Sequence, residues 1–195
     1  MKAIKDWDNV QAAGSGFNNL PAGGYVCEIK AVTEKPNRNS PGTHLEVMFD
    51  ISEGEYAGFF MKDWKANTRE DKFWRGTINQ NVPDEASPKY EMQAGFFKRF
   101  IQNVEESNPG YAWNWDEKTL ANKKIGVIFS EREKQSQKGT IYTVTNANGT
   151  ATVDQIRSGD YRIPEIKRLA PSPVAAADPW GDLPSVEDKD ADFPF

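Results

Sequence analysis

The sequence predicts a mainly β domain, a five-stranded Greek-key barrel with one main helix, followed by an acidic tail. Two patterns support the domain: several segments of strand length alternate apolar and polar residues, and one longer segment has the periodicity of an amphipathic helix. Composition supports the tail, because residues 171–195 are rich in Pro, Ala and Asp. Such a segment buries too little apolar surface to offset the entropy lost on ordering, so we expect it to be disordered.

The first three strands are expected in the N-terminal third of the chain. Residues 25–32 alternate well enough for a half-buried strand, and a turn rich in Pro and Gly precedes them at 21–24. Residues 44–52 give the clearest alternation in the chain. One face of that segment carries Leu45, Val47, Phe49 and Ile51. After a turn at 53–55, residues 57–65 are predicted to form the third strand.

Residues 92–106 are predicted to form the main helix. Its apolar residues recur three and four positions apart and should pack against the core. They are Phe96, Phe97, Phe100, Ile101 and Val104. The irregular segment 66–90 is compatible with one short helix at 69–74, and Trp113 and Trp115 are expected to cover the core.

Two further strands are predicted at 124–132 and 140–146, separated by a polar loop at 133–139. A short helix at 152–156 and an extended segment at 161–169 complete the domain. The order is therefore three strands, a helix and two strands, as in a five-stranded OB-type barrel, whose helix falls between strands three and four. Other small α+β folds share this order, so the order alone does not distinguish them.

The net charge of −5 is confined to the end of the chain. Residues 171–195 contain one cation and six acids, whereas the 23 cations and 23 acids of residues 1–170 cancel. We therefore divide the chain into an OB-type domain at 1–169, a disordered Pro/Ala-rich linker at 170–186 and an acidic interaction tip at 187–195. A neutral domain permits a local basic groove.

The tip places two aromatic rings beside clustered acids. Phe193 and Phe195 have no evident role without a partner, and Pro194 between them lowers the entropy lost on docking. This suits a small hydrophobic pocket rimmed by Lys and Arg. The tip resembles that of bacterial and bacteriophage single-stranded DNA-binding proteins, which typically end in several acids, an apolar residue, Pro and Phe. The residues that carry the resemblance are Asp188, Asp190, Asp192, Phe193, Pro194 and Phe195.

The resemblance implies an OB fold, sequence-tolerant coating and protection of single-stranded DNA, and recruitment of replication, recombination and repair enzymes. The body is more similar to the divergent phage-encoded members than to the housekeeping bacterial protein. Lys189 interrupts the acids, which departs from the family pattern and should weaken electrostatic attraction by the tip. Residues 178–184 repeat the acid–aromatic–proline theme and are either a second docking motif or an ordinary linker.

Sequence-tolerant binding of single strands needs cations along the phosphates and aromatic faces for the bases. Segments 60–65 and 69–75 interleave the two types, and OB folds also bind through the loops joining strands one to two and four to five. The expected DNA-binding residues are Lys35, Arg38, Lys62, Trp64, Lys65, Arg69, Trp74, Arg75, Arg132, Lys134, Lys138 and Tyr142. Trp64, Trp74 and then Tyr142 are the expected stacking residues.

Other classes of function stay open at this stage. An OB-type barrel also serves protein interaction or RNA binding, and the plentiful carboxylates are compatible with a metal-dependent nuclease. With His44 as the single histidine and Cys27 as the single cysteine, no His-based metal cluster or internal disulfide forms, and we expect no cofactor and no catalysis. No membrane span or signal peptide is predicted, so a cytoplasmic protein is expected, and a homo-oligomer is compatible with the sequence.

Overall fold

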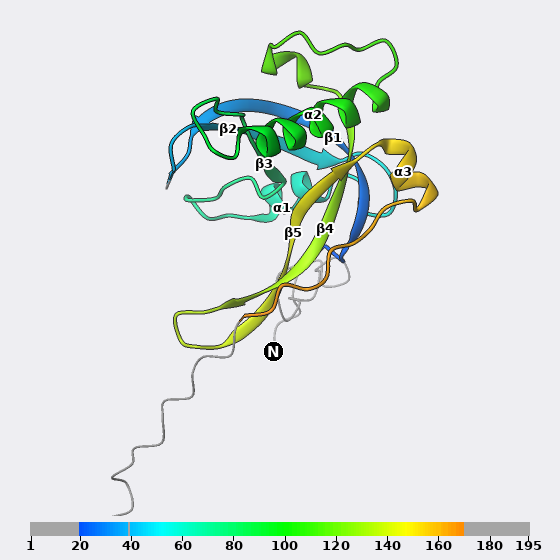
Figure 1. The fold of residues 1–195 in the computed structure, drawn as a ribbon. Helices are drawn as coiled ribbons and strands as arrows, with labels where there is room; N and C mark the ends of the chain where they lie inside the picture. The colour runs from blue at the N-terminus through cyan, green and yellow to red at the C-terminus, as the bar shows by residue number, and fades with distance from the viewer. Residues whose placement is uncertain (1–19, 39, 170–195) are drawn as a thin grey trace, which may run out of the picture.

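The computed structural model describes residues 20–38 and 40–169, so the linker, the tip and its six named residues lie outside the described residues. The described chain forms one antiparallel sheet in the order β3-β2-β1-β4-β5, with three α-helices (Figure 1). The strands are β1 (Gly23–Pro36), β2 (Thr43–Ile51), β3 (Thr77–Asn81), β4 (Lys124–Gln135) and β5 (Ile141–Ala151). The helices are α1 (Phe59–Ala66), α2 (Tyr90–Ser107) and α3 (Val153–Ser158).

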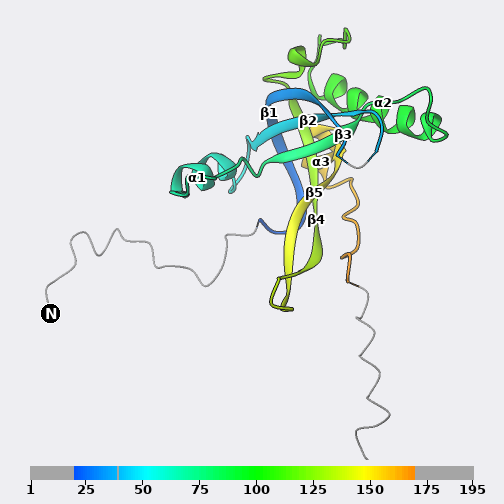
Figure 2. The same cartoon turned by 90° about the vertical axis from the view of Figure 1, so that its left-hand side faces the viewer.

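Strand β1 joins the two halves of the sheet. Its N-terminal residues pair with β4 and its C-terminal residues pair with β2, so that Cys27 lies between Ile125 on one side and Ile51 on the other. The pairing with β2 shifts register between Ile29 and Ala31, and such a bulge bends a strand. The sheet consequently coils, and its two edge strands, β3 and β5, approach each other (Figures 1 and 2).

The core lies inside this coiled sheet. The expected alternation in β2 is confirmed, because its four apolar residues on one face are all buried. Phe49 packs its ring edge-on against Phe60, with centroids 5.6 Å apart, and Phe129 of β4 stacks on Phe60. Helix α2, which covers the predicted helical segment 92–106, buries Phe97, Phe100, Ile101 and Val104 against this core.

The prediction of a third strand at 57–65 is wrong, because this segment forms helix α1. The buried carboxylate of Asp50, at the end of β2, accepts hydrogen bonds from the backbone N–H groups of Phe60 and Met61 at 3.0 and 3.2 Å. A carboxylate there satisfies N–H groups that a helix start leaves without partners. The third strand is instead β3, a short polar segment, and residues 69–74 form no helix.

Two aromatic residues expected in the core are on the surface. Phe96 lies at the margin of the apolar face of α2 and is 58% exposed. Trp115, whose backbone φ is 66°, is 83% exposed, whereas Trp113 packs against the core as expected. A 3₁₀ helix, Glu117–Leu120, then buries Leu120 and leads into β4. Exposed rings on an ordered backbone are candidates for contact with a ligand.

The remaining helices and strands lie where the sequence predicts them. Strands β4 and β5 are longer than predicted, and α3 begins with a capping box in which Thr152 and Gln155 exchange hydrogen bonds. Glycine is needed where α3 packs on the sheet, since a Cβ at Gly126 would lie 2.5 Å from Ile156. Residues 161–169 run back in extended form alongside β4. Among the described helices, none is long and apolar enough to cross a bilayer.

Candidate nucleic-acid interface

Strands β4 and β5 continue beyond the body as a hairpin, here called the arm and defined as residues 130–146 (Figure 1). In this arm Arg132 pairs with Val144 and Lys134 pairs with Tyr142. Residues directly opposite each other share one face, and successive residues alternate between faces. Both cations, the Tyr142 ring and Val144 therefore lie on the same face, which we call the basic face.

The opposite face of the arm is acidic. Glu131 pairs with Thr145 and Glu133 pairs with Thr143, so both carboxylates point away from Arg132 and Lys134. The side chains on the basic face are accessible: both cations are exposed and Tyr142 is 45% exposed. Lys138 is exposed at the turn of the same hairpin. The four residues predicted here are thus brought together, and sheet register separates the local charges by sign.

A returning segment pairs with the arm through an isolated bridge between Arg132 and Lys167. The backbone N–H of Glu133 donates to the carbonyl of Lys167 at 2.9 Å, and the N–H of Lys167 donates to the carbonyl of Glu131 at 3.2 Å. Leu169 N–H donates to the Glu133 carboxylate at 3.0 Å. The pairing is parallel and places the end of the described chain on the arm. The acidic segment 170–195 is therefore attached at the arm.

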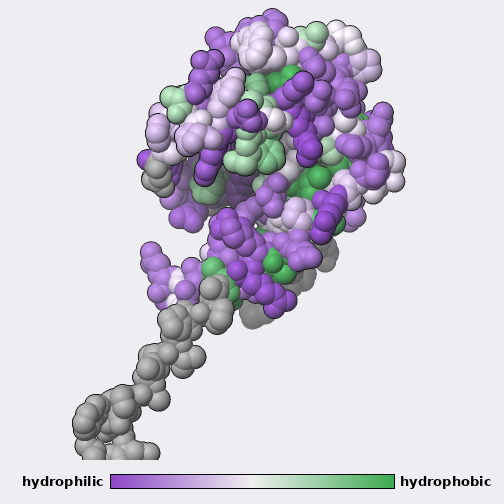
Figure 3. Space-filling view, viewed as in Figure 1, coloured by the Kyte–Doolittle hydropathy of each residue, from purple (hydrophilic) through white to green (hydrophobic). Residues whose placement is uncertain are grey.

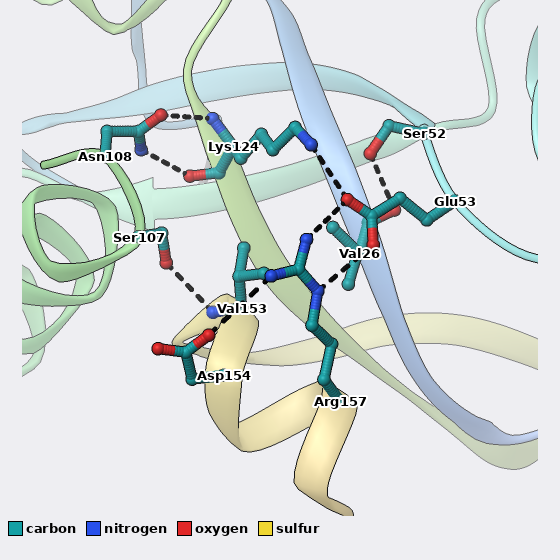
Figure 4. Close-up of polar contacts among 9 residues, drawn as sticks. All are labelled: Val26, Ser52, Glu53, Ser107, Asn108, Lys124, Val153, Asp154 and Arg157. Carbon is teal, nitrogen blue, oxygen red and sulfur yellow. Dashed lines mark hydrogen bonds and ion pairs between the residues drawn. The ribbon is translucent and has the colours of Figure 1, made fainter.

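Helix α3, which precedes the returning segment in the chain, is attached to the neighbouring elements by polar contacts (Figure 4). Glu53, after β2, accepts hydrogen bonds at 2.8 Å from both Lys124 and Arg157, which joins β4 and α3 to the end of β2. These hydrogen bonds, first from Arg157 and then from Lys124, lower the pKa of Glu53 to about 2. The backbone N–H of Val153 donates to Ser107 Oγ at 3.0 Å, which attaches α3 to α2. Helix α3 is thus attached at its first residue to α2 and near its last residue to Glu53.

A second group of predicted residues lies on α1 and the loop to β3, here called the α1 segment (59–76). Lys72 Nζ lies 4.7 Å from the ring centroid of Trp64, a cation–π geometry, and Trp64 is half-buried. The indole N–H of Trp74 donates to the carbonyls of Phe49 and Gly76 at 3.0 and 3.1 Å. Trp74 therefore has a structural role that accounts for its position. Phe73 beside it, which is not among the predicted binding residues, is 74% exposed.

Several cations of the α1 segment have partners within the protein. Arg75 lies 2.9 Å from Asp63, Arg69 lies 3.1 Å from Asp71, and Lys62 donates to the carbonyl of Ala57 at 3.0 Å. Lys65 is exposed on α1. The alternation of cations and aromatic rings predicted a DNA-binding site here. Several of these cations instead bind groups within the protein.

The remaining predicted residues, Lys35 and Arg38, lie at the β1–β2 loop. Lys35 pairs with Glu46 at 2.6 Å, and Arg38 is exposed. In Figure 2 this loop and α1 project on opposite sides of the sheet, with the arm below both. The predicted DNA-binding residues therefore occupy three separate places rather than one continuous site.

The structure also has a groove that sequence analysis missed. It lies between β3 and β5 beside α2, with a volume of about 630 Å³, and the exposed side chains of Phe96 and Arg99 line it. The residues that line the groove come from distant parts of the chain. The sequence contains one signal that could have indicated this groove. Phe96 and Arg99 are three residues apart, and residues at that spacing are neighbours on a helix.

Comparison of the sequence with protein-family models and with curated proteins finds no match. Within residues 20–38 and 40–169, no three His, Cys, Asp or Glu side chains gather in a way that could hold a metal ion. The case for a function therefore depends on the charge and geometry of the surfaces described above, together with the composition of the tail.

Proposed function

We propose that the protein binds single-stranded DNA with little sequence preference through an OB-type barrel, and recruits partner enzymes through its C-terminal tip. The strand order β3-β2-β1-β4-β5, with α2 between β3 and β4 in the chain, supports an OB-type assignment. In that fold the hairpin of the last two strands borders the nucleic-acid site. The arm occupies the corresponding position.

The basic face of the arm is the observation that carries this proposal. Single strands are held by cations along the phosphates and by aromatic rings that stack on bases, and stacking tolerates any sequence. Arg132, Lys134 and Tyr142 supply both groups on one accessible face. The carboxylates of the same strand lie on the other face, so they do not face a phosphate bound here.

The α1 segment adds a second aromatic surface. Phe73 is exposed, and Lys72 lies over the ring of Trp64, 4.7 Å from its centroid. One base stacked on an accessible ring contributes about 1–3 kcal/mol to binding. We propose that this segment contacts the strand through Phe73 and Trp64, while Trp74 supports the loop.

The tip has a separate role in the proposal. Its acids and terminal Phe193-Pro194-Phe195 suit a pocket on a replication, recombination or repair enzyme in the cytoplasm, of a phage-infected host if the chain is phage-encoded. Because the described chain ends at Leu169, whose N–H donates to Glu133 on the acidic face of the arm, the acidic segment starts on the same hairpin as the proposed DNA-binding cations but on its opposite face. Deleting 187–195 should abolish docking of partner enzymes and leave DNA binding intact, with a modest gain in affinity at low salt.

The test is a titration of intrinsic Trp fluorescence with oligo-dT, with single-stranded RNA and duplex DNA of equal length as competitors. Wild type should bind oligo-dT, and Lys134→Ala should weaken binding. Lys98→Ala, an equal charge change at an exposed position of α2, should not. Equal affinity for duplex, or no binding of oligo-dT, would contradict the proposal. Preference for RNA, or metal-dependent loss of the oligonucleotide, would favour the RNA-binding or nuclease alternative.

A further inference from the structure

We infer that the groove between β3 and β5 is a second binding segment for the same nucleic-acid strand, which continues from it onto the basic face of the arm. This inference depends on the proposed single-strand binding and specifies the path of the strand. It starts from Phe96, a helix residue whose position in the apolar stripe predicts burial but whose ring is 58% exposed at the groove. Figure 3 shows hydrophobic side chains exposed among hydrophilic ones on this side of the body.

The groove has the chemistry of a nucleotide site. Phe96 offers a ring to a base, and Arg99, one turn further along α2, offers a guanidinium to a phosphate. Amide side chains from both edge strands, Asn79 and Asn148, are exposed at its walls and can donate to or accept from base edges. None of the described residues that line the groove is acidic. Its volume of about 630 Å³ lies in the usual range for small-ligand sites.

Sheet register connects the groove to the arm. Ile128 lines the groove, and it lies on the same side of β4 as Arg132 and Lys134, because these positions differ by even numbers. At about 3.3 Å per residue, the distance along β4 from Ile128 to Lys134 is roughly 20 Å. Between them the basic side carries Ser130, which accepts a hydrogen bond from Asn148 at 2.9 Å. The residues on this side of β4 from Ile128 to Lys134 include no acid, and Ile128 and Ser130 are buried while Arg132 and Lys134 are exposed.

A bulge in β5 shapes this groove. The pairing of β4 with β5 skips Asn148, between Gly149 opposite Ile128 and Ala147 opposite Phe129. Bulges often re-aim side chains next to functional sites. A Cβ at Gly149 would meet Ile128 at 3.9 Å, which is ordinary contact. A larger side chain at this position therefore fills the groove without a backbone clash and without changing any charge.

The test uses three groove variants in full-length protein, titrated with oligo-dT: Gly149→Val, Phe96→Ala and Arg99→Gln. Gly149→Val and Phe96→Ala should each weaken binding at least about fivefold, the loss of about one stacked base. Arg99→Gln should lower the slope of log affinity against log salt by about 0.7, the value for one phosphate contact. Matched controls on the same helix, Met92→Ala and Lys98→Gln, change an exposed apolar and an exposed cationic side chain outside the groove and should bind as wild type.

A photocrosslink identifies the path directly and does not depend on affinity. Oligo-dT carrying 5-iodo-deoxyuridine should give adducts at Phe96 as well as at Tyr142. Melting temperatures identify any variant that unfolds, and Phe96→Ala, at an exposed position, should keep the wild-type value. If arm variants lose affinity while all three groove variants bind as wild type, and adducts form at Tyr142 but not at Phe96, the groove inference is wrong and the proposed function survives. Failure of wild type to bind oligo-dT would overturn both.

Discussion

The arm and the α1 segment have similar compositions but use their charges differently. Both combine Lys and Arg with aromatic and acidic residues, yet β-sheet register sorts the arm by face, whereas cations of the α1 segment pair with nearby acids. Arg75 and Arg69 lie 2.9 and 3.1 Å from Asp63 and Asp71. Arg132 and Lys134 instead share a face from which Glu131 and Glu133 point away. The same residue types thus give a binding surface in one place and mainly internal structure in the other.

The largest effect should come from the structural tryptophan of the α1 segment. Trp74→Ala removes packing against Phe60 and both indole hydrogen bonds, so we expect the free energy of unfolding to fall by about 3 kcal/mol. Chemical denaturation measures this. Trp64→Ala provides the comparison and should cost less, because within residues 20–38 and 40–169 the indole N–H of Trp64 donates no hydrogen bond. If Trp74→Ala kept wild-type stability and lost DNA affinity, the two regions would not differ as described.

The next largest effect should be on DNA affinity, because the cations and the carboxylates of the arm lie on opposite faces. Tyr142→Ala should weaken oligo-dT binding by about 1–3 kcal/mol, because one stacked base is lost, with stability unchanged at this exposed site. The matched change on the opposite face is Ile141→Ala, since Ile141 is 57% exposed and lies one residue away. Anisotropy titrations should show a loss for Tyr142→Ala alone. Equal losses of affinity in both variants would mean that DNA binding does not distinguish the two faces of the arm.

A smaller effect is expected at Phe73. Its ring is 74% exposed and no described ring packs on it, so Phe73→Ala should leave the melting temperature unchanged and reduce DNA affinity by about 1 kcal/mol. The same titrations measure it, with Met61→Ala, an exposed apolar residue of α1, as control. Unchanged affinity would restrict the DNA site to the arm and the groove.

The smallest effect concerns the carboxylate that attaches α3. The pKa of Glu53 is lowered to about 2 from an ordinary 4.5, so its stabilising effect is present above pH 4.5 and is lost as pH falls toward 2. Because its side chain is about one-third exposed, solvent screening reduces this to about 1 kcal/mol. Denaturation of wild type and Glu53→Gln should differ by that amount at pH 7 and converge toward pH 2. If the difference in stability between wild type and Glu53→Gln instead grew as the pH fell, the ion pair of Glu53 could not be its cause.

The structure of a region can be predicted from sequence when the residues that determine it lie close together in the chain. The alternation in β2 and the stripe of α2 fix burial within a few residues, so most of the core could be predicted. Residues 57–65 become helical because Asp50, seven residues earlier in the chain, caps the segment, and a contact between separate elements leaves no periodic signal. The polar segment of β3 likewise shows no strand alternation. The arm residues could be predicted individually, but the groove depends on how three distant elements meet.

The proposed function requires that phosphates bind on the basic face of the arm. The most direct measurement is the salt dependence of oligo-dT affinity for wild type, Lys134→Gln and Lys98→Gln. Each phosphate contact on a single strand contributes about −0.7 to the slope of log affinity against log salt. If a phosphate binds Lys134, Lys134→Gln should make the slope less steep by about 0.7, while Lys98→Gln should leave it unchanged. A slope for Lys134→Gln equal to that of wild type would mean that no phosphate binds at this position.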